Sequence, residues 1–107
     1  MTFDDARAIC MAMPGVEEST YYGTPAFNVR GKAFCRLKED GETLVLFDVP
    51  IEEREVICEA DPEIYYFTDH YRDWPAVLAR LPACGPEHVR GYLERSWRTR
   101  APKAGLK

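Results

Sequence analysis

Cationic and aromatic side chains are concentrated in the segment from Thr68 to Trp74. The members suited to chemistry are His70, Tyr71, Arg72 and Trp74. Cations attract phosphate groups and aromatic rings stack on bases, so the composition predicts contacts with nucleic acid, with the two rings forming an aromatic surface. A structural alternative stays open. The rings could instead pack in the core or at a sheet edge, while the neighbouring acids Asp69 and Asp73 neutralise Arg72.

A second cationic group follows an even-numbered register between residues 30 and 38. Its members are Arg30, Lys32, Arg36 and Lys38, with Phe34 between them. In a regular strand, alternate residues share one face, so these cations could follow a phosphate backbone while the exposed phenyl ring stacks on a base. The alternative is a solvated sheet face whose cations pair with Glu39, Glu42 and Asp48.

The third cationic group lies near the C-terminus. Residues 90–107 contain six cations and one acid, which gives a local charge of +5. Because the whole chain carries −4, residues 1–89 carry −9. Arg95, Arg98, Arg100 and Lys103 could therefore reach phosphates. They could equally stabilise the negative end of a helix dipole without any ligand.

The sequence contains no recognisable catalytic or metal-binding motif. Ser19, Ser96 and the cysteines have no recognisable base beside them, His70 and His88 fall in no known motif, and no phosphate-binding glycine motif occurs. The four cysteines, Cys10, Cys35, Cys58 and Cys84, lie more than about twenty residues apart among apolar neighbours, unlike the close pairs of zinc sites. We therefore expect buried reduced thiols, no cofactor, no metal and no enzyme activity.

Composition is that of an ordinary globular protein. The 107 residues are 46% hydrophobic and 30% charged, which is enough for one core without disulfides. No apolar run approaches a membrane span, and the acidic start lacks signal-peptide features, so a cytoplasmic protein with no membrane partner is expected. One domain over residues 1–107 is predicted, with a flexible basic tail at 98–107.

The elements that must position these side chains can be read from periodicity and turn residues. A helix capped by Thr2 ends at Pro14-Gly15, and antiparallel strands fill residues 18–48, with an Asp-Gly hairpin turn at 39–42. A short helix at 51–60, strands at 64–67 and 76–81, and a last helix beginning at Gly85-Pro86-Glu87 follow. This order predicts an α+β fold, with an antiparallel sheet flanked on one face by the N- and C-terminal helices.

The chain resembles the MmcQ/YjbR family of small bacterial proteins. The resemblance rests on Met13–Glu18, Gly31–Leu37, His70-Tyr71 with Trp74, Leu93–Trp97 and Ala101-Pro102-Lys103. It implies a frataxin/CyaY-like sheet flanked by terminal helices. It also implies DNA binding through a paired-wing arrangement of hairpins, and it provides no catalytic residues.

The sequence-based hypothesis is therefore a non-enzymatic domain that binds DNA weakly and in a salt-dependent manner. The residues predicted to contact nucleic acid are Arg30, Lys32, Arg36, Lys38, His70, Arg72, Arg95 and Arg98. The alternative is a protein–protein or small-ligand interaction module that uses the aromatic loop 68–74. The oligomeric state cannot be predicted from these patterns.

Overall fold

The first helix forms because its N-terminus is capped by side chains. The computed structural model describes residues 1–101, and its first element is α1 (Phe3–Met11). The Thr2 hydroxyl accepts a hydrogen bond from the Asp5 amide, and the Asp5 carboxylate accepts one from the Thr2 amide. This reciprocal cap satisfies two amide groups that the helix itself leaves free, as the sequence predicted.

Four strands follow as a meander: β1 (Val16–Tyr21), β2 (Thr24–Val29), β3 (Lys32–Leu37) and β4 (Thr43–Phe47). Arg30 and Gly31 join β2 to β3 with φ of 54° and 76°, a left-handed pair typical of two-residue hairpin turns. The β3–β4 turn is held by the Asp40 carboxylate, which accepts hydrogen bonds from the Glu42 and Thr43 amides. The predicted Asp-Gly hairpin is confirmed.

The second half adds α2 (Ile51–Ala60), β5 (Tyr65–Tyr66), β6 (Ala76–Arg80) and α3 (Arg90–Arg100), with 3₁₀ turns at Asp69–Tyr71, Leu81–Ala83 and Pro86–His88. The last helix begins later than predicted, because Pro86–His88 forms a separate turn and Val89 departs from helical geometry. Its end also differs. Residues 98–100 are helical and not part of a flexible tail, whereas Lys103 and the rest of the predicted tail lie outside the described residues.

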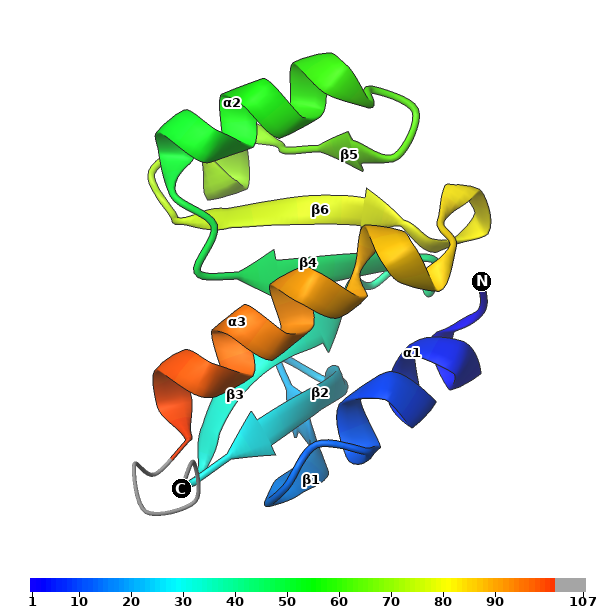
Figure 1. Cartoon of the computed structure of the whole chain (residues 1–107), viewed down its shortest axis with the longest axis vertical. Coiled ribbons are helices and arrows are strands. Elements are labelled where there is room, and N and C mark those ends of the chain that lie inside the picture. Colours follow the sequence, from blue (N-terminus) through cyan, green and yellow to red (C-terminus); the bar gives the residue numbers. More distant parts are fainter. Residues whose placement is uncertain (102–107) are drawn as a thin grey trace.

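All six strands form one antiparallel sheet in the order β1-β2-β3-β4-β6-β5. Figure 1 shows α1 and α3 on the same face of this sheet, with α2 running along β5 and β6 at one edge. The main core lies between these helices and the sheet, and includes Phe27, Leu44, Leu46 and Leu93. The α+β class with terminal helices on one face is confirmed.

No α-helix within residues 1–101 covers the opposite face of the sheet (Figure 1). Here a smaller cluster forms from Val45, Tyr71, Ala76 and Leu78. The loop between β5 and β6 supplies Tyr71, so this loop covers part of the face that the helices leave open. A pocket lies on the part of this face that the loop leaves uncovered.

A β-bulge changes the strand that carries the predicted basic register. Asn28 pairs with Ala33 and Phe27 pairs with Cys35, so Phe34 is an extra residue in β3. It joins its neighbour Cys35 in the main core and is fully buried. The prediction of an exposed Phe34 among cations on one face is therefore wrong, because the bulge interrupts the alternation between Lys32 and Arg36.

Candidate ligand pocket on the open sheet face

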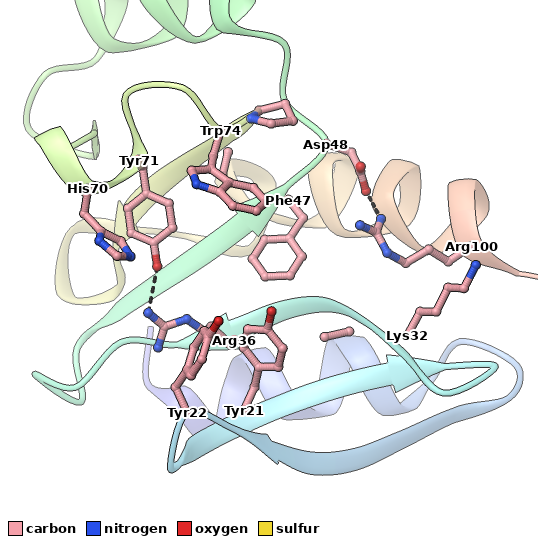
Figure 2. Close-up of a pocket in the computed structure, with 13 residues that line it drawn as sticks. Tyr21, Tyr22, Lys32, Arg36, Phe47, Asp48, His70, Tyr71, Trp74 and Arg100 are labelled. Carbon is pink, nitrogen blue, oxygen red and sulfur yellow. Dashed lines mark hydrogen bonds and ion pairs between the residues drawn. The ribbon is translucent and has the colours of Figure 1, made fainter.

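A cavity of about 490 Å³ opens on this face, between the β1–β2 turn, the loop before β6 and the end of α3 (Figure 2). Five aromatic side chains line it: Tyr21, Tyr22, Phe47, Tyr71 and Trp74. Its charged side chains are three cations and one acid: Lys32, Arg36, Arg100 and Asp48. The charged lining therefore carries +2 in a chain whose total is −4, and His70 completes the rim.

Arg36 lies beneath the pocket and is 5% exposed. Its guanidinium donates to the Tyr71 hydroxyl at 2.7 Å and to Glu39 at 3.1 Å, which joins β3 to the loop before β6. Burial alone would lower the pKa of Arg36, but these two partners hold it above its usual value. Arg36 is thus a buried strut that positions Tyr71, and its predicted role as an exposed phosphate ligand does not fit this geometry.

The loop before β6 is held from below by Arg54 of α2, which is 1% exposed. Its guanidinium donates to the carbonyl oxygens of Tyr71, Arg72, Trp74 and Ala76. It also lies 3.9 Å from the centre of the Phe67 ring, and within residues 1–101 no carboxylate pairs with it. Four backbone dipoles and one aromatic face therefore take the place of a counter-ion.

The two most exposed aromatic side chains in the described chain both line this pocket. Trp74 is 64% exposed, on the loop that Arg54 holds, and Tyr22 is 79% exposed, at the tip of the β1–β2 hairpin. Tyr22 has φ of 54° and Gly23 has φ of 79°. A bulky residue rarely adopts this left-handed conformation, so the turn presents an aromatic ring where glycine or asparagine would be less strained.

The remaining predicted cations divide into two groups. Lys38 pairs with Glu39, Arg72 with Asp69 and Arg95 with Glu53. Arg30, Lys32 and Arg98 are exposed, and no ion pair to them occurs in the part of the chain that the structure describes. The predicted cations therefore do not form one continuous positive stripe, because acids interrupt it at three positions.

A family model for YjbR matches residues 11–99. The chain belongs to the YjbR family. The crystal structure of the Deinococcus radiodurans protein DR2400, described with a DUF419 domain, has a TM-score of 0.72 against it at 22% sequence identity. The match covers 96% of this chain and 80% of that chain, and at this identity it shows the fold. No functionally curated protein matches.

Most of the pocket lining of this YjbR domain was not predicted from the sequence. Tyr21, Tyr22 and Phe47 were not predicted as site residues, Asp48 was predicted only as an ion-pair partner, and Arg100 only as part of the C-terminal cationic group. Of the predicted aromatic surface, Trp74 is exposed, whereas Tyr71 is 8% exposed and contributes only part of its ring. The one available signal was the adjacent pair Tyr21-Tyr22 before Gly23, two aromatic residues at a hairpin turn.

The cysteines of the YjbR domain fit the expected packing role. Cys10, Cys35 and Cys84 are buried and Cys58 is half-buried, all as free thiols. Burial raises the pKa of the Cys35 thiol, so it stays protonated at neutral pH. Across residues 1–101, no three side chains of His, Cys, Asp or Glu converge where they could hold a metal ion. None of the helices in that range is long and apolar enough to cross a bilayer.

Proposed function

We propose that this YjbR domain is a non-enzymatic binding module whose site is the pocket, and that its ligand is a flat aromatic group bearing negative charge. The observation that supports this is the joint composition of the lining: five aromatic rings together with three cations and one acid in an acidic protein. Glu39 neutralises one of these cations, Arg36, so Lys32 and Arg100 are the two that remain to attract a ligand. Rings attract a planar ligand by stacking, and the local positive charge selects an anion. The volume is within the usual range for small-ligand sites.

An unpaired nucleotide in a nucleic-acid strand presents both features, a base and a phosphate. The predicted DNA binding is thus proposed in a changed form, through unpaired bases rather than along a duplex. Four of the expected phosphate ligands, Arg36, Lys38, Arg72 and Arg95, are held in ion pairs, which leaves little for a duplex backbone. Stacking on exposed rings needs an unstacked base, and contributes about 1–3 kcal/mol per base.

A free aromatic anion of small size is the second candidate, supported by the concave shape of the site. A protein partner that docks on Trp74 is the other alternative, since an exposed tryptophan on a rigid loop is a frequent anchor of protein interfaces. Both alternatives use the same residues as the proposal. They differ from the proposal because neither requires a single-stranded oligonucleotide to bind.

Fluorescence anisotropy with a labelled single-stranded oligonucleotide tests the proposal. We expect binding to the single strand that exceeds binding to the matching duplex, and a loss of about tenfold in Trp74→Ala. Met11→Ala is the matched control, because Met11 is a 44% exposed apolar residue on α1, away from the pocket. Equal binding by Trp74→Ala and the unaltered protein, or tighter binding of the duplex, would contradict the proposal.

A further inference from the structure

One end of the pocket brings together Lys32, Asp48 and Arg100, from the start of β3, the residue after β4 and the end of α3 (Figure 2). Arg100 is ion-paired with Asp48, and their side chains are 21% and 24% exposed. Lys32 is exposed, and within residues 1–101 no carboxylate pairs with it. Among the described side chains, this end therefore carries two cations and one resident anion, a net charge of +1.

Asp48 is fixed in place and cannot easily leave this end of the pocket. Its carboxylate accepts a hydrogen bond from the Ser96 hydroxyl at 2.7 Å, and its backbone carbonyl accepts one from Arg95 at 3.3 Å. Three side chains of α3 thus hold one residue. Asp48 also has φ of 64°, in the left-handed region, so its position is maintained against an intrinsic backbone preference.

We infer that Lys32, Asp48 and Arg100 form the anion subsite of the pocket, and that Asp48 makes it select a singly charged phosphodiester over a phosphate monoester. This inference rests on the proposed function. Attraction to a site of charge +1 grows in proportion to the charge of the ligand, whereas the cost of removing water from the ligand grows with the square of that charge. A monoanion is fully neutralised at this end, and a dianion leaves one negative charge beside Asp48.

The chemical consequence is a preference for an internal nucleotide of a strand. Its phosphate is a diester with one negative charge, whereas a free mononucleotide carries between one and a half and two charges near neutral pH, since the second pKa of a phosphate monoester is about 6. A resident carboxylate that disfavours the wrong partner is a means of specificity as effective as a new attractive contact. Asp48 thus makes the site prefer an internal nucleotide of a strand to a free mononucleotide.

The test uses three adenine probes that share one base and differ in charge: adenosine, adenosine 5′-monophosphate and its methyl ester. Affinities are measured by NMR titration of the 107-residue chain. In the unaltered protein we expect the methyl ester to bind more tightly than the monophosphate, and both to bind more tightly than adenosine. A monophosphate that binds as tightly as its methyl ester, or more tightly, would overturn the inference.

Asp48→Asn is the discriminating variant, because asparagine tolerates the left-handed backbone and has no charge. Removing one negative charge should improve the binding free energy of a dianion by twice as much as that of a monoanion. We therefore expect the affinity to rise roughly threefold for the methyl ester and roughly tenfold for the monophosphate, and to stay unchanged for adenosine. The melting temperature should fall, because the Arg100 ion pair is lost. Parallel changes for all three probes would indicate a purely structural role and overturn the inference.

Lys32→Gln provides a second measurement if Asp48→Asn folds poorly, because Lys32 is exposed and makes no ion pair within residues 1–101. This substitution should weaken the affinity for the methyl ester by roughly threefold. The affinity for adenosine and the melting temperature should stay unchanged, because Lys32 contacts only the phosphate and stabilises no ion pair of the described fold. Equal affinity of Lys32→Gln and the unaltered protein for the methyl ester would overturn the subsite. The proposed function fails separately, if neither adenosine nor an oligonucleotide binds.

Discussion

Arg54 illustrates how a single residue determines the shape of the binding surface. It is a buried cation with no carboxylate partner in the described chain, and it collects four carbonyl oxygens from the loop between residues 71 and 76. Lysine could not replace it, since an ammonium group lacks the planar fork that reaches several acceptors at once. The consequence is a fixed loop, so the backbone of Trp74 is held in place while its ring is exposed.

Asp40 leads to a prediction about pH. Burial alone would raise its pKa, but hydrogen bonds from Glu42 and Thr43 hold the pKa below its usual value. The charged form is therefore favoured by folding. This contribution is present above about pH 4, the ordinary value for an aspartate, and is lost as the pH falls through the lowered pKa of the folded state.

The variant that tests this is Asp40→Asn, which should lower the free energy of unfolding by about 1 kcal/mol at pH 7. The difference from the unaltered protein should shrink as the pH is lowered from 5 to 2, because protonation then removes the same charge. Urea unfolding across this range measures it. Glu42→Gln in the same turn is the control and should show no comparable loss at pH 7, since the Glu42 side chain makes no hydrogen bond in the described structure.

At the scale of elements, the turns around the pocket hold backbone strain. The non-glycine residues with left-handed φ in the described chain are Tyr22, Arg30 and Asp48. Tyr22 and Asp48 line the pocket, and Arg30 starts the turn that leads to Lys32. Such residues are uncommon and concentrate at functional sites, so the presence of Tyr22 and Asp48 in the pocket lining supports the assignment of the site.

The hairpin tip provides the second prediction. Tyr22→Asn should stabilise the fold by about 1 kcal/mol, because asparagine accepts the left-handed conformation that costs tyrosine roughly this amount. The same change removes a ring from the pocket wall and should weaken oligonucleotide binding by about tenfold. Thermal unfolding and anisotropy measure the two effects. Tyr22→Phe keeps the ring and should change neither. A Tyr22→Asn protein that binds as well as the unaltered one would remove Tyr22 from the site.

For the whole molecule, the distribution of ion pairs matters more than the number of cations. The predicted basic strand would place four cations along one strand, but the fold pairs Arg36 and Lys38 with Glu39, and the bulge at Phe34 separates this pair from Arg30 and Lys32. The pocket leaves Lys32 and Arg100 as the cations nearest an incoming phosphate. The acidic remainder of the surface then opposes any further contact with a nucleic-acid backbone.

The salt dependence of binding should therefore be shallow. One or two phosphate contacts to a single strand give a slope near −1 in a plot of the logarithm of affinity against the logarithm of salt concentration. Four contacts along a basic strand would give a slope near −3. Anisotropy titrations at several salt concentrations separate the two cases. A slope of about −3 would support phosphate contacts along the predicted basic strand at residues 30–38. A slope of zero would exclude phosphate contacts altogether.

The local elements were determined by the sequence itself. The capped first helix, the Asp-Gly hairpin, the helix at 51–60 and the α+β order follow from caps, turn residues and periodicity, which act over a few neighbouring residues. The family resemblance, carried by short motifs in order along the chain, is likewise confirmed by the match over residues 11–99.

The binding surface was decided by tertiary structure. The bond from Arg36 to Tyr71 joins residues 35 positions apart, and the pair of Asp48 and Arg100 spans 52 positions. One extra residue in β3 turns Phe34 into the core and ends the alternation on which an exposed basic register depended. Whether a charged side chain is free or paired depends on which strands and helices meet, and this is set by the pairing of the sheet and the packing of α3, over distances that local patterns do not reach.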